Sequence, residues 1–191
     1  RNTRQIHEIA ARLGRSGGRC EGGEPTNPAV CREGPAPELF TTDSDEELLD
    51  RLRRKTALFI EEMGYDPENI CVLVPRRREL QTVAEALAGA GYETEDIRSN
   101  EFSFQSSGKL RISTLHSSKG LDFPVVLIYL PYLHRRSYYD DEQTDALLRN
   151  LIFVGLTRAM DNLNVFMKES VDPILLDLKA AFEQTGSTEE G

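Results

Sequence analysis

Apolar residues occur along the chain in two alternating patterns. Continuous apolar runs at residues 70–74 and 124–130 indicate strands that are buried on both faces. Apolar residues spaced three and four apart indicate helices instead. One such helix begins at the capping box Ser44-Asp45-Glu46-Glu47 and ends at Gly64. The same patterns predict further helices at 2–13, 80–87, 141–160 and 173–184, and further strands at 38–42, 92–97, 109–114 and 163–167.

This order of elements predicts the fold class. Strands that alternate with helices form right-handed crossovers, so we expect an α/β fold with a mostly parallel sheet flanked by helices. Ligands of such sheets bind at the carboxyl ends of strands, and functional residues are therefore expected just after Val74 and Thr114. Residues 14–37 are rich in Gly and Pro, which predicts a long flexible loop. Residues 185–191 are predicted to be a disordered tail.

Length and composition narrow the class of protein. The 191 residues fit one domain, and because the first residue is Arg1 rather than Met we expect a fragment or a processed product. No apolar run is long enough to span a bilayer, and no secretory signal is present. Three cysteines without a C-x-x-C spacing predict reduced thiols, no metal site and a cytoplasmic location.

The net charge of −9 argues at first against a nucleic-acid binder. Its distribution weakens that argument, because the acidic residues are gathered in runs such as 43–47 and 140–142. Such runs are typical of solvated helix starts. Most of the basic residues are Arg, whose planar guanidinium suits phosphate. The total charge therefore does not exclude nucleic acid.

Two segments contain candidate chemistry. Residues 112–123 follow a predicted strand and combine hydroxyls, an imidazole, a lysine and Gly120, a set that can hold phosphate oxygens, although Ser-rich loops without a ligand are also common. The phosphate loop G-x-x-x-x-G-K-[ST] is absent from the sequence. In residues 149–160, Arg158 is predicted to lie within an apolar helix and to need an anion. A structural ion pair with an acidic neighbour such as Asp161 and a functional role explain Arg158 equally well.

Together these segments resemble a known family. T-x-H-x-x-K-G-L-[ED]-F-x-x-V followed by R-x-L-x-[YF]-V-G-L-T-R-A is similar to motifs V and VI of the UvrD/Rep-like superfamily 1 helicases. Arg1-Asn2-Thr3 resembles the end of the family's N-Y-R-[SN]-T element, and the turn after Val74 resembles its motif IVa. The resemblance implies that residues 1–191 are the second RecA-like motor domain, called 2A. The short stretch between residues 88 and 108 leaves no room for the 2B domain that larger relatives insert there.

The resemblance also implies roles in nucleotide hydrolysis. ATP and Mg²⁺ would be held mainly by a first RecA-like domain, which this sequence lacks. Arg158 and Arg1 match arginine fingers that reach the γ-phosphate from the second domain. Gly120 matches the backbone that meets the γ-phosphate, Lys119 precedes it, and Asp122 matches an acidic residue that contacts the ribose.

On the nucleic-acid side, Thr114 and His116 match positions that hold phosphates of single-stranded DNA. The motif IVa Arg and Asn of the family fall on Pro75 and Arg77, so we expect the DNA contact to pass to the cluster of Arg76, Arg77 and Arg78. An exposed basic helix start is an equally good interpretation of that cluster. A loop with aromatic and basic residues suits base stacking or simple exposure equally well, and it contains Tyr132, Arg135, Arg136, Tyr138 and Tyr139.

The leading hypothesis is an enzyme. The chain would be the motor domain of an ATP-dependent single-stranded DNA translocase or helicase, 3′→5′ as is usual in the family, acting as a monomer and inactive without its first domain. The alternatives are a helicase-derived module that binds nucleic acid or RNA polymerase without motor activity, and the motor part of a helicase–nuclease. No membrane association is expected.

Overall fold

A six-stranded parallel sheet forms the centre of the protein. The computed structural model describes residues 2–16, 32–100, 102–103, 108–133 and 141–186. The strands are β1 (Glu38–Thr42), β2 (Ile70–Val74), β3 (Thr94–Asp96), β4 (Leu110–Thr114), β5 (Phe123–Leu130) and β6 (Ala159–Lys168). Their order across the sheet is β1-β6-β5-β2-β4-β3, and every neighbouring pair is parallel. The predicted fold class is therefore confirmed.

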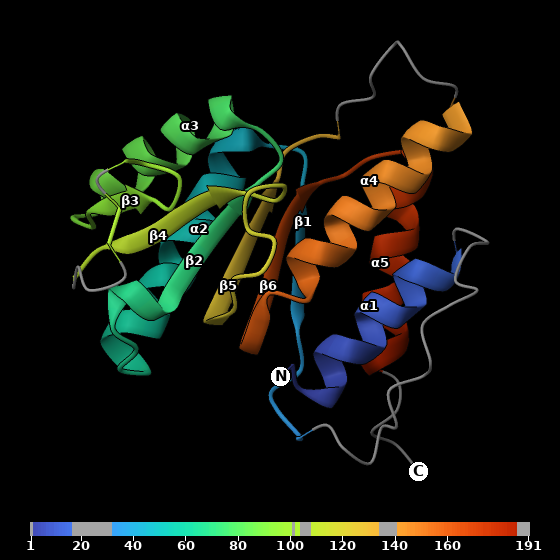
Figure 1. Cartoon of the computed structure of the whole chain (residues 1–191), viewed down its shortest axis with the longest axis horizontal. Coiled ribbons are helices and arrows are strands. Elements are labelled where there is room, and N and C mark those ends of the chain that lie inside the picture. Colours follow the sequence, from blue (N-terminus) through green and yellow to red (C-terminus); the bar gives the residue numbers. More distant parts are fainter. Residues whose placement is uncertain (1, 17–31, 101, 104–107, 134–140, 187–191) are drawn as a thin grey trace.

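Helices cover both faces of the sheet (Figure 1). One face packs against α1 (Arg4–Ser16), α4 (Asp141–Leu156) and α5 (Pro173–Gly186), and the other against α2 (Asp45–Ala57) and α3 (Arg77–Ala88). Alternate residues of β5 belong to the two cores, with Val126 and Ile128 on the α1/α4/α5 side and Val125 and Leu127 on the α2/α3 side. This burial on two faces explains why the strand is continuously apolar.

Local signals in the sequence fix several boundaries. Ser44 caps α2 as predicted, because its Oγ accepts a hydrogen bond of 3.3 Å from the backbone N–H of Glu47. The helix then passes into a π-helical turn at Leu58–Glu62 and stops before Gly64, whose φ is +72°. A 3₁₀ turn, Pro67–Asn69, leads into β2.

Other boundaries differ from those predicted. Helix α1 extends to Ser16, so the first residues of the predicted loop 14–37 are helical, and residues 17–31 lie outside the described residues. The strand predicted at 92–97 is limited to Thr94–Asp96. Helix α5 extends to Gly186, two residues into the predicted tail, and residues 187–191 lie outside the described residues.

The most consequential correction concerns the end of α4. The predicted helix 141–160 stops at Leu156, and β6 already begins at Ala159, so Arg158 lies in a turn rather than within a helix. At the end of the helix, the Thr157 hydroxyl donates to the carbonyls of Phe153 and Val154, at 3.0 Å each, and so supplies a donor to acceptors of the last turn. The backbone N–H of Phe123 in β5 donates to the Arg158 carbonyl at 2.9 Å, which draws the following residues into the sheet.

The parallel strands give the sheet two chemically distinct edges. Both β4 and β5 pair in parallel with β2, so the chain leaves β4 at the carboxyl edge and must return to the amino edge before β5 begins. A five-residue strand measures about 16 Å at roughly 3.3 Å per residue. Residues 115–122 span this distance, and Leu115 at their start is fully buried in the core beside α4. This segment therefore connects the two edges directly.

Candidate functional site

At the amino edge of the sheet, Arg158 is held by several acceptors. Its Nε donates to the Val154 carbonyl at 3.0 Å, and its Nη2 donates to the Thr157 hydroxyl at 3.2 Å. Its Nη1 lies 3.2 Å from Asp122 Oδ1 and 3.5 Å from the Leu121 carbonyl. The carbonyls at the end of α4 bear the partial negative charge of the helix dipole, which adds to the attraction for a cation. The guanidinium is thus pre-positioned at this edge and only 18% exposed.

The partner of Arg158 is Asp122, not Asp161 as one interpretation of the sequence had it. Asp161 pairs with Arg32, whose Nη2 also donates to the Met160 carbonyl at 3.0 Å. The Asp122 side chain is 53% exposed, so solvent screens its end of the pair, whereas the Arg158 side chain is mostly buried.

The residues just before Asp122 are open to solvent. Gly120 has φ +86°, a conformation that glycine adopts without strain, and a Cβ added there would meet no atom within 4 Å. Lys119 and Gly120 are both exposed. Residues 119–122 therefore present a cation, an open stretch of backbone and a carboxylate next to Arg158. Arg1, the other predicted finger, lies outside the described residues.

The predicted DNA contacts gather at the opposite, carboxyl edge. Thr114 pairs with Val74 across the β2–β4 ladder, and Arg76 and Arg77 follow Val74 at the start of α3. The Thr114 hydroxyl donates to Ser117 Oγ at 2.9 Å and accepts from the Ser117 N–H at 3.2 Å. His116 and Arg77 are exposed, and Arg76 is half-buried. The structure thus separates Thr114, His116, Arg76 and Arg77 from Asp122 and Arg158 by the length of a strand.

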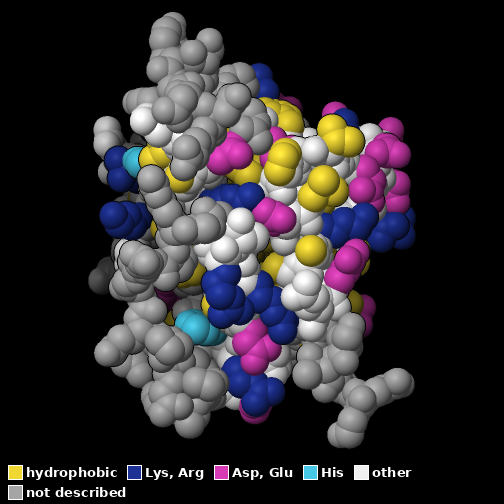
Figure 2. Space-filling view, turned by 90° about the vertical axis from the view of Figure 1, so that its right-hand side faces the viewer, with side chains coloured by type: hydrophobic (Ala, Val, Ile, Leu, Met, Phe, Trp, Pro, Cys, Tyr) yellow, Lys and Arg dark blue, Asp and Glu magenta, His cyan; other side chains and the backbone are white. Residues whose placement is uncertain are grey.

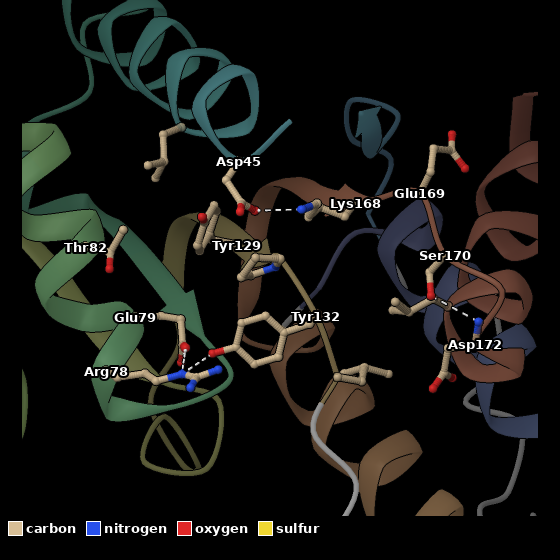
Figure 3. A pocket seen from close by; sticks show the side chains of 14 residues that line it. Asp45, Arg78, Glu79, Thr82, Tyr129, Tyr132, Lys168, Glu169, Ser170 and Asp172 are labelled. Carbon is tan, nitrogen blue, oxygen red and sulfur yellow. Dashed lines mark hydrogen bonds and ion pairs between the residues drawn. The ribbon is translucent and has the colours of Figure 1, made fainter. Parts of the chain in front are cut away.

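Sequence reasoning missed a cavity at this carboxyl edge. It measures about 620 Å³ and is lined by the N-terminal residues of α2 and α3 and the residues after β5 and β6 (Figure 3). The Arg78 guanidinium lies 4.5 Å from the centroid of the Tyr132 ring and bonds to the Tyr132 hydroxyl and the Glu79 carboxylate. Burial, together with the charges of Asp45 and Glu79, raises the pKa of Tyr129 to about 12.

One signal for this cavity was present in the sequence. Glu79 lies on the apolar stripe of α3, directly before Leu80, and is buried with one carboxylate oxygen that has no protein partner. A carboxylate at a core position of a helix predicts a polar cavity or a partner. Of the aromatic loop considered for base stacking, Tyr132 is engaged with Arg78, while Tyr138, Tyr139, Arg135 and Arg136 lie outside the described residues.

The face made by α1, α4 and α5 shows no large patch of a single charge in its described part (Figure 2). Lys and Arg side chains lie beside Asp and Glu side chains there, with apolar ones between them. Arg149, the first arginine of the motif VI segment, has structural partners: its Nη2 lies 2.5 Å from Asp177 Oδ2 in α5, and its Nη1 donates to Ser16 Oγ in α1 at 3.0 Å. Arg149 therefore ties three helices together.

The described residues contain neither a metal site nor a membrane span. No group of three or more His, Cys, Asp or Glu side chains among them is arranged to hold a metal ion. No helix in the described part of the chain is both long and apolar enough to cross a membrane. The donors at the amino edge suit phosphate oxygens, since they comprise a guanidinium, an ammonium and exposed backbone.

Comparisons with known proteins identify a family that part of the chain matches. Residues 109–166 match the family described as UvrD-like helicase C-terminal domain. A stretch of 79 residues is 40% identical to the ATP-dependent DNA helicase srs2 of Schizosaccharomyces pombe, covering 38% of this chain and 8% of that protein. The chain therefore spans only a small part of the length of this relative.

A solved structure resembles the chain over nearly its whole length. The C-terminal domain of a possible DNA helicase from Lactobacillus plantarum superposes with a TM-score of 0.65, covering 95% of both chains at 20% sequence identity. At this identity the likeness establishes the fold alone. Both candidate motifs, V and VI, lie within residues 109–166. The resemblance predicted from these motifs is therefore confirmed, since residues 109–166 match the family described as UvrD-like helicase C-terminal domain.

Proposed function

We propose that this chain is the second motor domain of an ATP-dependent single-stranded DNA translocase or helicase with 3′→5′ polarity. The observation that supports it best is the course of residues 115–122. This segment begins beside Thr114 at the carboxyl edge and ends at Asp122, which pairs with Arg158 at the amino edge. A motor must link nucleotide hydrolysis to movement along DNA, and here one short segment touches both candidate sites.

On the nucleotide side, Arg158 would act as an arginine finger. A guanidinium brought to the phosphates of ATP stabilises the charge that develops in the transition state. ATP would bind mainly to the first motor domain of the same polypeptide. Mg²⁺, held there as well, would neutralise charge on the phosphates. Gly120 and Lys119 would face the phosphates and Asp122 the ribose, and Arg158 would exchange the exposed carboxylate of Asp122 for a phosphate oxygen.

On the DNA side, Thr114, His116, Arg76 and Arg77 would hold the phosphates of a single strand. Hydroxyl, imidazole and guanidinium contacts to phosphate position a strand without selecting its sequence. The net charge of −9 predicts weak binding by this chain alone. Binding by the complete protein should weaken steeply as salt is raised, because phosphate contacts release counterions.

The test is made on the complete protein, with its first motor domain present. Arg158→Ala should lower DNA-stimulated ATP hydrolysis by about 10³–10⁵-fold, the range for loss of an arginine finger, and leave binding of a fluorescent ATP analogue nearly unchanged. Arg149→Ala is the matched control, since it removes an arginine of the same motif that bonds to Asp177, and it should keep turnover while lowering stability. Wild-type turnover in Arg158→Ala would refute the assignment.

One observation favours a second candidate, a nucleic-acid-binding module without motor activity. Arg158 already has a carboxylate and two carbonyls as partners within the chain, as a purely structural arginine would. The complete polypeptide discriminates between the two. A motor requires a G-x-x-x-x-G-K-[ST] phosphate loop upstream of Arg1 and ATP hydrolysis that depends on DNA. A binding module would retain DNA affinity with neither.

A further inference from the structure

The side chain of Asn2 bonds to the backbone on both sides of Arg158. Its Nδ2 donates to the Thr157 carbonyl at 2.9 Å and to the Ala159 carbonyl at 2.6 Å. A primary amide has two N–H groups, so one hydrogen is available for each carbonyl. One side chain near the N-terminus thus bridges residues 157–159, and Arg158 is the middle residue of the three.

The backbone around Arg158 needs such a bridge. Strand β1 pairs with β6 only from Asn164 onward, so at the start of β6 the only neighbouring strand is β5 within the described part of the sheet. Thr157 directly follows the last residue of α4, where helix carbonyls have no partner within the helix. Asn2, together with Arg32 on the Met160 carbonyl, supplies donors where the sheet and the helix do not.

Asn2 is itself held in place by its neighbours. Thr3 is fully buried, and it packs so closely on Gly34 that a Cβ added to Gly34 would lie 2.1 Å from Thr3 Cγ2. The Arg4 N–H donates to the Arg32 carbonyl at 3.0 Å, and α1 then anchors the segment in the core through residues such as Ile6. The backbone that follows Asn2 is therefore anchored by contacts other than those of its amide.

We infer that Asn2 is a positioning residue for Arg158, setting the place of its guanidinium through the backbone of residues 157–159. The inference rests on the proposed function of Arg158 as an arginine finger. Asn2 contacts no reacting group; it acts through the turn. A misplacement of about 1 Å in a catalytic group can cost on the order of 10²-fold in rate, which sets the scale of the effect.

Asn2→Leu keeps the approximate size of the side chain and removes both donors. In the complete protein it should lower kcat for DNA-stimulated ATP hydrolysis by about 10–100-fold with a change in KM for ATP of less than about twofold. Gln5→Leu is the matched control. Gln5 bonds to Gly34 and Glu33 in the same cluster, so its loss keeps the bonds from Asn2 to the carbonyls of Thr157 and Ala159. Gln5→Leu should keep kcat within about twofold of wild type.

Amide hydrogen exchange on the 191-residue chain gives a readout that does not depend on activity. In Asn2→Leu, the N–H groups of residues 157–161 should exchange at least about tenfold faster, while those of β2 keep their protection. If Asn2→Leu does not fold, Asn2→Ser, which keeps one donor, should give the same pattern with a smaller change. Unchanged exchange at 157–161, or an equal rise throughout the sheet, would overturn the inference.

The outcomes separate this inference from the proposed function. If Arg158→Ala hydrolyses ATP at the wild-type rate, the proposed function fails, whatever Asn2→Leu does. If Arg158→Ala loses turnover and Asn2→Leu retains full kcat, only the positioning role of Asn2 fails. Loss of turnover in both, with normal turnover in Gln5→Leu and faster exchange confined to 157–161, supports both statements.

Discussion

Replacing Gly155 by alanine should destabilise the protein, although alanine is the better helix former. Gly155 is buried in α4, and an ideal Cβ there would lie 2.3 Å from Leu115 Cδ2 and 3.4 Å from Ile128 Cδ1. The Leu115 side chain is fully buried and cannot move aside freely. The substitution therefore forces the helix away from the segment 115–122, at the place where the two motif segments pack together.

The expected magnitude follows from two opposing terms. Alanine in place of glycine inside a helix gains about 0.5–1 kcal/mol. Overpacking a buried position costs about 1–3 kcal/mol, and a contact of 2.3 Å belongs at the upper end of that range. The net loss in the free energy of unfolding should be about 1–2 kcal/mol. For a domain of this size, this lowers Tm by about 2–8 °C.

Thermal and urea unfolding of the 191-residue chain measure this directly. Gly89→Ala is the matched control, since Gly89 lies at the end of α3 in an ordinary helical conformation and a Cβ there meets only carbonyls at 3.5 Å. It should change stability by no more than about 0.5 kcal/mol. In the Leu115→Ala background the cost of Gly155→Ala should shrink, because the clashing atoms are gone. A higher Tm for Gly155→Ala would refute the tight packing of α4 on Leu115.

Three further predictions concern other parts of the molecule. Glu95→Ala should lower the free energy of unfolding by about 1–3 kcal/mol in urea, because Arg111, which is only 2% exposed, loses its carboxylate but keeps the Ser103 carbonyl and the Phe102 ring; an unchanged stability would contradict a tight buried pair. Since the folded-state pKa of Tyr129, about 12, exceeds its ordinary value of 10, its protonated phenol favours the folded state. That contribution to the free energy of unfolding is complete below pH 10 and is lost as pH rises toward 12. In Tyr129→Phe, the urea midpoint should not show this part of the decrease between pH 10 and pH 12. Gly120→Ala should lower the free energy of unfolding by about 1–2 kcal/mol, seen as a lower Tm, since φ is +86° there; an unchanged Tm would argue against that conformation.

Most of the fold could be predicted because its signals are local. The apolar run of β2 and the Ser44 cap of α2 each lie within a few residues, and both are found as predicted. The end of α4 could not be predicted, since apolar residues continue helix-like beyond Leu156. The hydrogen bond from Phe123 to the Arg158 carbonyl, between residues far apart in sequence, is what starts the strand instead.

The candidate site, like the fold, could be predicted from the sequence only in part. Arg158 and Asp122 could each be picked out by its motif, but their ion pair depends on the return of residues 115–122 across the sheet. No local sequence pattern predicts the path of residues 115–122 across the sheet. The bonds from Asn2 depend on the N-terminal segment meeting the start of β6, and the cavity beside Glu79 depends on where α2, α3 and α5 converge. Such features arise from packing between elements, which spacing in sequence does not encode.

The path of residues 115–122 also suggests how one candidate site could influence the other. Its first residue is locked in place, because the Leu115 N–H donates to the Val74 carbonyl at 2.8 Å and its side chain packs against Gly155 of α4. Its last residue, Asp122, is exposed and is held through its ion pair with Arg158. If Arg158 left Asp122 for a phosphate, this end would lose that contact while the buried end stayed fixed. Movement would then pass along 115–122 toward Thr114 or through α4, and because the core at Leu115 is close-packed, a small shift there cannot be absorbed locally.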